Sequence, residues 1–274
     1  MRVSITDDFS LKRIADCGQC FRAKEIGPGL FRFINGERIL YISEVCPGQF
    51  EVSCDADEWN GVWLDYFDLN TNYAAIRASV PESDRFLTEA ANAAAGIRIL
   101  RQDPWEMLIS FIISQRKSIP AIKTTIESLC SSFGRCCHTR YEDLYLFPSV
   151  SSLWEASSVA LQECRVGYRT AYIQDAVMRV HSGKLNLNDA NLLPDEELLA
   201  VLKSVKGVGD KVANCVSLFG YHRTAAVPID VWVKRVIDKY YDGVNPFPAY
   251  GNAAGIMQQY AFFYAQEQSR RGCF

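Results

Sequence analysis

The pattern of apolar and polar positions changes along the chain. In the first part, short apolar stretches over 31–34 and 38–42 flank Asn35-Gly36, a dipeptide typical of a type I′ hairpin turn. A further strand is predicted over 49–54. From about residue 83 onward, the apolar residues recur at helical spacing to the end of the chain.

The helical part carries clear start and stop signals. Asp103-Pro104-Trp105-Glu106 combines an N-cap, a proline at the first helical position and a glutamate three residues after the cap. The helix predicted over 105–115 is apolar nearly all round, which is typical of a buried central helix. Further helices are predicted over 118–132, 169–181, 195–203, 210–219, 230–240 and 250–267. Left-handed caps are predicted at the glycines just past four of these helices, Gly134, Gly183, Gly220 and Gly243.

These elements predict an α+β protein with two domains. A small N-terminal antiparallel-sheet domain is expected over 1–95, and a larger all-α domain over 96–274. The length of 274 residues and the 49% apolar content fit a globular protein of this size.

The composition indicates where in the cell the protein works and whether it holds metal sites or disulfides. No apolar run has membrane-spanning length, and the N-terminus lacks the pattern of a signal peptide. We therefore expect a protein that is not secreted and that works in the cytoplasm or nucleoid of a prokaryote or the nucleus of a eukaryote. The ten cysteines include Cys17-Gly18-Gln19-Cys20, but no second close pair follows it. They are predicted to be buried free thiols, with no metal and no disulfide.

Charge is distributed unevenly. The formal net charge of −3 argues against a protein that coats nucleic acid over its whole surface. Residues 203–240 nevertheless contain seven Lys or Arg against three Asp, whereas 51–70 contain six acidic residues and no basic one. The pattern predicts a local positive field that binds one site.

The most informative segment is Val205-Lys206-Gly207-Val208-Gly209, which leads into an apolar helix. Two glycines allow a tight turn and the close approach of another backbone. The N–H groups at the start of the following helix suit a phosphate. The segment predicts a hairpin that grips a nucleic-acid backbone.

Two side chains next to this hairpin could carry out chemistry. Lys211 lies in the first turn of the helix, where the dipole disfavours a positive charge and eases formation of a nucleophilic amine. Asp230, in Val227-Pro228-Ile229-Asp230, could stabilise a positively charged sugar. The simpler interpretations are a lysine that binds phosphate and an aspartate that only caps a helix.

Together these motifs resemble the helix-hairpin-helix DNA glycosylase superfamily and, within it, the 8-oxoguanine DNA glycosylase family. The resemblance runs through nearly the whole chain. Besides the hairpin, its motifs are Gly18-Gln19-Cys20-Phe21-Arg22, Asp103-Pro104-Trp105-Glu106, Phe111-Ile112-Ile113-Ser114, Gly167-Tyr168-Arg169 and Gly255-Ile256-Met257-Gln258-Gln259-Tyr260-Ala261-Phe262. Each is weak alone, but their common order is specific.

The resemblance implies roles for individual residues. Lys211 would be the nucleophile of a bifunctional glycosylase and lyase, with Asp230 as its catalytic partner. The residues implied to surround the flipped base are Gly18, Cys215, Gln258 and Phe262. The Gly18 carbonyl would accept a hydrogen bond from the N7–H of 8-oxoguanine, which guanine lacks. Gln258 would bind the Watson–Crick edge, and Phe262 and Cys215 would hold the two faces of the base.

The resemblance also implies a DNA surface. Tyr168 would wedge into the base stack, and Arg169 would contact the orphaned opposite base. The residues expected to contact DNA are Gln115, Arg116, Tyr168, Arg169, Gly207, Gly209, Val212 and Trp232. No cofactor is expected, although the carbonyls of Lys203, Val205 and Val208 could hold a monovalent ion. The expected partner is double-stranded DNA containing oxidised guanine, bound by a monomer.

One departure from the family pattern concerns the opposite base. Where the family has an asparagine run and then an arginine, this chain has Arg116-Lys117-Ser118 and then Ala121. Two arginines supply only donors to the orphaned base, so we expect excision opposite adenine to approach that opposite cytosine.

The sequence therefore predicts a base-excision-repair enzyme that removes 8-oxoguanine and then cleaves the abasic site by β-elimination. Two alternatives remain. The enzyme could prefer other oxidised or alkylated purines, or the chain could be a damaged-DNA-binding module without activity.

Overall fold

The computed structural model describes residues 1–274 and divides them into two compact units. The first unit comprises residues 1–33, 39–101 and 222–274, and the second comprises residues 34–38 and 102–221. The predicted domains, 1–95 and 96–274, divide the chain differently, because residues 222–274 pack with the N-terminal part. The predicted domain boundary between residues 95 and 96 therefore stays a prediction. None of the helices reaches the length and apolarity that a membrane span requires.

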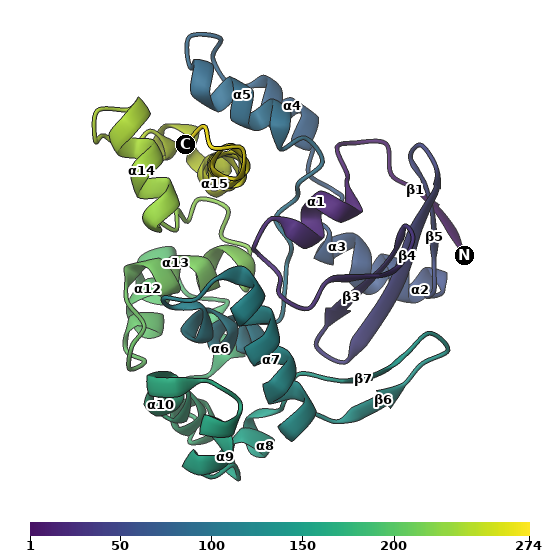
Figure 1. The fold of residues 1–274 in the computed structure, drawn as a ribbon, viewed down its shortest axis with the longest axis vertical. Helices are drawn as coiled ribbons and strands as arrows, with labels where there is room; N and C mark the ends of the chain where they lie inside the picture. The colour runs from purple at the N-terminus through teal and green to yellow at the C-terminus, as the bar shows by residue number, and fades with distance from the viewer. The chain divides into compact units, whose positions relative to one another are not determined.

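The first unit contains a five-stranded antiparallel sheet, several short helices and the last two long helices (Figure 1). The strands run in the spatial order β1-β5-β4-β3-β2. Their bounds are β1 Arg2–Ser4, β2 Lys24–Gly27, β3 Leu30–Asn35, β4 Arg38–Cys46 and β5 Gln49–Val52. The helices are α1 Leu11–Asp16, α2 Ala56–Glu58, a π-helical turn Trp59–Trp63, α3 Leu64–Tyr66, α4 Tyr73–Ala78, α5 Arg85–Ala93, α14 Val231–Tyr240, a 3-10 helix Phe247–Ala253 and α15 Ala254–Arg270.

The turn between β3 and β4 differs from the type I′ turn predicted on Asn35-Gly36. Strand β3 continues through Asn35, so the two turn residues are Gly36 and Glu37. Of these only Gly36 has a positive φ, +57°. A type I′ turn needs positive φ at both central residues, so the predicted type I′ turn on Asn35-Gly36 is wrong.

A buried arginine ties the N-terminal loops of the first unit together. Arg98 is fully buried, and its guanidinium donates to Asp7 Oδ2 at 2.7 Å and to the carbonyls of Asp8, Asp68 and Thr71. It also stacks over the Tyr73 ring, with 4.4 Å between Cζ and the ring centroid. These partners satisfy a charge that would otherwise be costly to bury.

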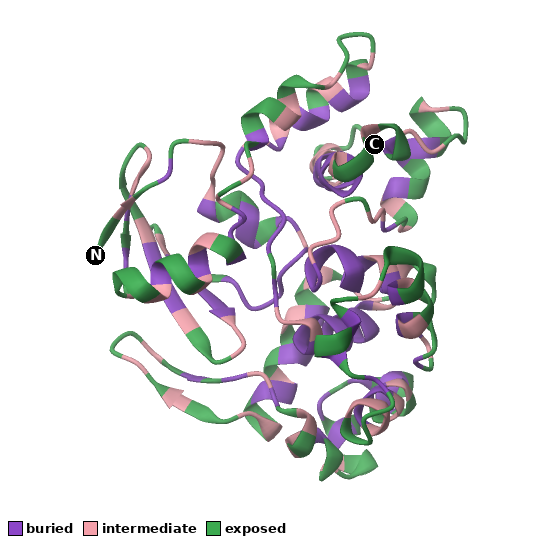
Figure 2. Ribbon diagram, turned by 180° about the vertical axis from the view of Figure 1, so that it is seen from behind, coloured by how far each residue is buried: buried purple, intermediate pink, exposed green.

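The second unit is almost entirely helical (Figure 1). Its elements are α6 Pro104–Ser114, α7 Ile119–Phe133, β6 Cys136–His138, β7 Asp143–Tyr145, α8 Val150–Trp154, α9 Ser158–Glu163, a 3-10 turn Gly167–Arg169, α10 Thr170–His181, α11 Leu187–Ala190, α12 Asp195–Lys203 and α13 Asp210–Phe219. All the residues of α6 except Pro104 are buried, as its apolar sequence predicts (Figure 2). Asp103 accepts a hydrogen bond from the Glu106 N–H at 2.8 Å, which confirms the predicted N-cap.

The structure departs from the predicted elements where elements are short. The two-stranded hairpin β6–β7 interrupts the segment that was expected to be wholly helical, because three-residue strands leave too few positions to show a period. The short helices α1 to α4 were missed for the same reason. The predicted helix over 250–267 begins in the 3-10 helix Phe247–Ala253 and continues as α15, and Gly251 interrupts the 3-10 helix with a φ of +53°.

Two of the four predicted glycine caps are wrong. Gly183 and Gly243 have φ of +74° and +81°, as predicted. Gly134 and Gly220 have negative φ values, −83° and −98°. Both lack room for a side chain: a Cβ on Gly134 would lie 1.9 Å from the Leu146 carbonyl oxygen, and one on Gly220 would lie 2.8 Å from the Val216 carbonyl oxygen. Close backbone approach, not a left-handed turn, requires these two glycines.

The cysteines only partly follow the prediction of buried thiols. The five buried ones are Cys17, Cys20, Cys130, Cys164 and Cys215. Cys46, Cys136 and Cys273 are exposed, and Cys54 and Cys137 are intermediate. Cys46 and Cys136 lie at exposed strand positions, which composition alone does not distinguish from core positions.

Candidate active site

Helices α12 and α13 and the turn between them form a helix-hairpin-helix in the second unit (Figure 1). Gly209 is the N-cap of α13, with extended backbone angles and no side chain to cap the helix. The first N–H groups of α13 therefore lack the side-chain partner that an Asp or Ser cap would supply. A Cβ on Gly209 would meet no atom within 4 Å, so this side of the hairpin is open to another backbone.

Gly207 has the opposite surroundings. Its φ is +80°, and a Cβ would lie only 2.3 Å from the ring of Tyr172 on α10. The Tyr172 ring therefore packs directly on the hairpin backbone. On the same side, the Lys206 N–H donates to Asp175 Oδ2 at 2.8 Å, which fixes the hairpin to α10 at a second point.

Lys211 is the second residue of α13 and is half-buried. Its Nζ donates to Ser114 Oγ at 3.5 Å, at the C-terminal end of α6. It also lies 5.2 Å from the centroid of the Phe111 ring. The amine is thus held near the end of α6, where the predicted DNA-contact residues Gln115 and Arg116 follow.

Two further residues of α13 were predicted to belong to the site, and both are buried. Val212 is 4% exposed and Cys215 is 3% exposed. Cys215 lies one helical turn after Lys211, on the same face.

The loop after α6 contains the residues that depart from the family pattern. Arg116 is exposed and has φ +53°, in the left-handed region. Lys117 is half-buried, and its Nζ donates to Thr125 Oγ1 and to the Arg165 carbonyl oxygen, the latter at 2.8 Å. Gln115 Nε2 donates to the Ile112 carbonyl oxygen at 3.2 Å, back into α6.

The predicted wedge and its neighbour have different surroundings. Tyr168 is 53% exposed, whereas Arg169 is 5% exposed. The guanidinium of Arg169 donates to the carbonyl oxygens of Val166 and Gln115 and lies 4.4 Å from the Tyr168 ring centroid. Its side chain is therefore already bonded within the protein.

The carbonyls considered for a monovalent ion lie at the end of α12 and in the hairpin. The Val205 carbonyl oxygen accepts a hydrogen bond from the Val208 N–H at 3.0 Å. Lys203 pairs through its side chain with Asp210 at 3.0 Å. An ion bound by the carbonyls of Lys203, Val205 and Val208 stays a prediction.

In the first unit, Asp230 is the N-cap of α14. One of its carboxylate oxygens, Oδ1, accepts hydrogen bonds from the N–H groups of Trp232 and Val233, both at 2.9 Å. These bonds fix the orientation of the carboxylate. Trp232 is half-buried, and the Arg235 guanidinium lies 5.3 Å from its ring centroid.

The segment around Gly18 is held from several sides within the first unit. Gly18 has φ +82°, a conformation that favours glycine. The next side chain, Gln19, donates to the Arg98 carbonyl oxygen at 2.6 Å and accepts from the Leu100 N–H at 2.8 Å. Gln259 on α15 donates to the Cys17 carbonyl oxygen at 2.7 Å. Burial raises the pKa of the Cys17 thiol to about 11, so this thiol stays neutral.

The two predicted base-pocket residues of α15 lie on consecutive turns of the helix. Gln258 is 3% exposed, and its Oε1 is buried without a hydrogen-bond partner. Phe262, four residues later, is half-buried. A buried amide oxygen without a donor is costly, and a ligand that donates to it would remove that cost.

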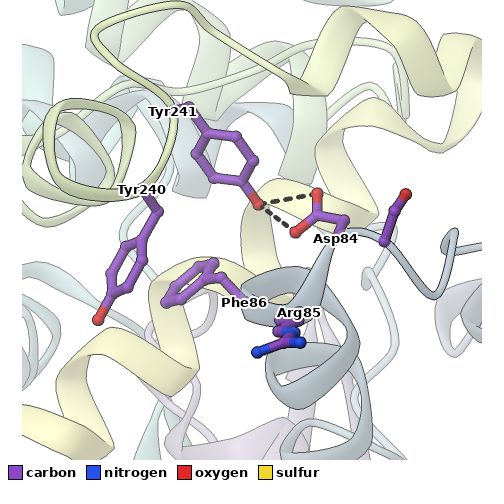
Figure 3. Close-up of a pocket in the computed structure, with 6 residues that line it drawn as sticks. Asp84, Arg85, Phe86, Tyr240 and Tyr241 are labelled. Carbon is purple, nitrogen blue, oxygen red and sulfur yellow. Dashed lines mark hydrogen bonds between the residues drawn. The ribbon is translucent and has the colours of Figure 1, made fainter.

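A separate aromatic pocket of about 450 Å³ lies in the first unit (Figure 3). It is lined by Ser83, Asp84, Arg85, Phe86, Tyr240 and Tyr241, and none of the predicted site residues is among them. The Tyr241 hydroxyl donates to both oxygens of Asp84, at 2.9 and 3.0 Å. Burial and the Asp84 carboxylate raise the pKa of Tyr241, so it remains a donor. Two of the polar groups of the pocket are therefore paired with each other, and none of its lining residues was predicted to take part in the chemistry.

Several residues that hold the segments of the candidate site had no role predicted from the sequence. They are Ser114, Lys117, Tyr172, Gln19 and Gln259. Ser114, Gln19 and Gln259 do lie inside the quoted motifs, which was the available signal. Lys117 and Tyr172 carried no such signal, because their contacts join segments 48 and 35 residues apart.

The chain is similar to several known proteins. A family model described as the N-terminal domain of 8-oxoguanine DNA glycosylase matches residues 2–108. The N-glycosylase/DNA lyase of Saccharomyces cerevisiae is 39% identical over 192 residues, 65% of this chain and 50% of that protein. The chain thus aligns with about half the length of this curated relative.

Solved structures match more completely. MBOgg1 in complex with a low-affinity DNA ligand has a TM-score of 0.91 at 34% identity, over 98% of this chain and 96% of the other. The 8-oxoguanine glycosylase/lyase of Clostridium acetobutylicum, in complex with DNA containing cytosine opposite 8-oxoG, has a TM-score of 0.89 at 34% identity, over 98% of both chains. These matches confirm the expected fold class. With its motifs in the family order and nearly its whole length matched to these relatives, the chain belongs to the 8-oxoguanine DNA glycosylase family of the helix-hairpin-helix superfamily.

Proposed function

We propose that this chain is a base-excision-repair enzyme that flips 8-oxoguanine out of duplex DNA, cleaves its glycosidic bond and then cleaves the abasic site. Membership of the family supports this function. The observation that carries it is the position of Lys211, a half-buried amine at the start of the hairpin helix, held by Ser114 and Phe111.

Lys211 acts as the nucleophile. Its neutral amine attacks C1′ of the sugar, the bond from C1′ to the base breaks, and the base leaves with that electron pair. One amine proton passes to the departing base and the other to the ring oxygen O4′ as the sugar ring opens, which leaves a Schiff base between Nζ and C1′. Removal of a proton from C2′ then expels the 3′ phosphate by β-elimination.

Asp230 stabilises the positive charge that develops on the sugar as the glycosidic bond breaks. Its two hydrogen bonds to the backbone of α14 hold the carboxylate still. A carboxylate that is fixed before the reaction needs no reorganisation in the transition state.

Base recognition rests on Gly18, Gln258, Phe262 and Cys215. The unpaired Oε1 of Gln258 suits the N–H groups on the Watson–Crick edge of a guanine-type base. Gly18, in a segment held by Gln19 and Gln259, supplies the carbonyl for the N7–H of the oxidised base. Phe262 and Cys215 bind its two faces.

The partner is duplex DNA, bound by a monomer through the open face of the hairpin and through Gln115, Arg116, Tyr168, Trp232 and their neighbours. The enzyme works where DNA is kept, in the nucleoid or cytoplasm of a prokaryote or the nucleus of a eukaryote.

Borohydride trapping tests the proposal. The protein is incubated with duplexes that contain 8-oxoguanine, undamaged guanine or an alkylated purine, and a reduced covalent complex is measured on each. We expect trapping and strand cleavage on the 8-oxoguanine duplex only. Trapping on the alkylated purine alone would favour the alternative substrate class, and duplex binding without trapping on any lesion would exclude the covalent mechanism.

A further inference from the structure

The β6–β7 hairpin of the second unit carries a cysteine, a histidine and an aspartate on one face. The hairpin extends away from α7 and α8 (Figure 1). In its register, Cys137 pairs with Leu144, and His138 pairs with Asp143. Leu144 is buried, so its face of the hairpin is directed inward. Because successive side chains of a strand alternate, the other face is exposed, and it carries Cys136, His138 and Asp143.

Hydrogen bonds join these three side chains in a fixed order. His138 Nδ1 lies 2.8 Å from Asp143 Oδ1, and its Nε2 lies 3.9 Å from Cys136 Sγ. A carboxylate only accepts hydrogen bonds, so Nδ1 carries the proton of the neutral ring and Nε2 carries the lone pair. That lone pair faces the thiol. A nucleophile, a base and a third group that orients the base form the arrangement by which proteins activate a nucleophile.

The other polar groups next to Cys136 do not replace the imidazole. Arg135 comes directly before it in the chain, and its guanidinium donates to Cys137 Sγ at 3.6 Å and pairs with Glu37 at 3.3 Å. A guanidinium stays protonated and accepts no proton. Tyr145, the cross-strand partner of Cys136, offers a phenol, which is a much weaker base than an imidazole. The imidazole is therefore the base for this thiol.

Exposure alone does not distinguish Cys136 from other cysteines of the chain. Cys46 and Cys273 are exposed as well. Of the chain's three histidines, however, His181 stacks on an aromatic ring and His222 pairs with a buried carboxylate. Among the three exposed thiols, Cys136 is thus the one that has a histidine as its neighbour.

We propose that Cys136 is a modification site that reacts with low-molecular-weight disulfides, with His138 as the general base and Asp143 as a positioning residue. Thiol–disulfide exchange needs a deprotonated attacking sulfur and no further group from the protein, so these three side chains suffice. This site goes beyond the proposed function and does not depend on it.

The exchange is balanced without any other reactant. The thiol proton passes to His138 Nε2 as Cys136 Sγ attacks one sulfur of the disulfide R–S–S–R. The bond between Sγ and that sulfur forms, and the S–S bond of the disulfide breaks. The leaving thiolate takes the electron pair of this bond and then the proton from Nε2. The products are a mixed disulfide on Cys136 and one molecule of R–SH.

Rates of modification at individual cysteines test the proposal. The whole chain, without DNA, is incubated at about pH 7 with bis(2-hydroxyethyl) disulfide, an uncharged probe, and peptide mass spectrometry measures the mixed disulfide at each cysteine over time. Cys46 and Cys273 are the exposed internal references. We expect Cys136 to react at least about tenfold faster than either, which is below the full effect of a general base because the cluster is exposed. Equal rates at the three thiols would overturn the proposal.

Substitutions separate the base from the group that orients it. His138→Gln should lower the rate at Cys136 to that of Cys46, because an amide accepts no proton at this pH. Asp143→Asn should give an intermediate rate, since a neutral amide orients the ring less firmly than a carboxylate. His181→Gln, at an exposed histidine with no cysteine beside it, is the matched control and should leave the rate unchanged. An unchanged rate in His138→Gln would show that the imidazole is not the base.

Two further readouts distinguish this chemistry from a loosened hairpin. The advantage of Cys136 over Cys46 should shrink as the pH rises past about 8.5, because ordinary thiols then ionise without a base. An advantage that stays constant across this range would contradict general-base activation. The half-buried Cys137 reports on opening of the hairpin, and its rate should not change in His138→Gln. Faster reaction at Cys137 in this variant would assign the effect to loss of the hairpin and overturn the role of His138.

Discussion

The two side chains assigned to the chemistry differ in what else they do. Lys211 makes one hydrogen bond, at 3.5 Å, and one contact with an aromatic ring, so its replacement removes little from the fold. Asp230 caps α14 with two backbone hydrogen bonds, so its replacement affects both catalysis and stability. Variants of the two residues therefore need different controls.

For Lys211, we expect Lys211→Gln to abolish borohydride trapping and base excision, because no other amine is proposed to attack the sugar. Duplex affinity should fall by less than tenfold, since one charge among several is lost. Lys206→Gln, an exposed lysine of the same hairpin, is the control and should keep trapping. Strong strand cleavage by Lys211→Gln would contradict the covalent mechanism.

For Asp230, a pair of variants separates charge from capping. Asparagine caps helices as well as aspartate, so Asp230→Asn should slow excision at least tenfold while the melting temperature stays unchanged. Asp230→Ala should slow excision and also lose about 1 kcal/mol of stability. Equal excision rates for Asp230→Asn and the wild type would show that Asp230 only caps α14 and has no catalytic role.

At the scale of elements, the hairpin depends on two glycines for different reasons. Gly207 needs its left-handed backbone and the space that the Tyr172 ring occupies. Gly209 has ordinary extended backbone angles and open surroundings. A side chain at this position would therefore meet no protein atom, but it would fill space that a bound ligand could occupy.

This difference predicts opposite results from the same substitution. Gly207→Ala should destabilise the protein by roughly 1–3 kcal/mol, because the new methyl group displaces Tyr172 and the backbone is strained. Gly209→Ala should leave the melting temperature nearly unchanged but weaken DNA binding, because the methyl group lies where a phosphate approaches. Thermal melting and duplex binding of both variants test this, and equal melting temperatures would contradict it.

At the scale of the whole molecule, the net charge of −3 conceals a basic segment over 203–240. If this segment and its neighbours contact about four phosphates, log affinity should fall with log salt concentration at a slope of roughly −3.6. Binding titrations at several salt concentrations measure the slope. A slope near zero would show that the basic segment does not bind DNA.

The buried Arg98 makes stability depend on pH in acid. Burial by itself raises the pKa of Asp7. Hydrogen bonds from the backbone of Tyr73 and Ala74 and the charge of Arg98 outweigh this effect, so the pKa lies below its usual value of 3.8. A carboxyl whose pKa is lower in the folded state stabilises the protein above its unfolded pKa, and this contribution is lost as pH falls through the folded value.

We therefore expect Asp7→Asn to cost roughly 3 kcal/mol at neutral pH, since Arg98 loses its ionic partner. The variant should also lose less stability than the wild type as pH falls below 3.8. Asp16→Asn, an exposed partner of Lys12, should have almost no effect. Denaturant unfolding at several pH values compares the three proteins, and parallel losses in acid would contradict the assignment to Asp7.

Local sequence signals determined the fold class and the long helices. Helix α6 begins where its cap and proline predict, because those signals act within one turn. Lys211 and Asp230 could be proposed as the chemical residues because each lies at a helix start beside a recognisable motif. Short elements such as β6 and β7 escaped, since three residues show no period.

Tertiary structure decided everything that depends on contacts between distant segments. Gly134 and Gly220 have the sequence context of left-handed caps, yet neighbouring carbonyl oxygens decide their role. Residues 222–274 pack with the N-terminal part of the chain, and no local sequence pattern predicts this packing. The resemblance to the family implied that Arg169 contacts the opposite base, but only the structure shows its bonds to the carbonyl oxygens of Gln115 and Val166. A sequence specifies which groups are present and how neighbours along the chain are spaced, but only packing determines which donors are already paired.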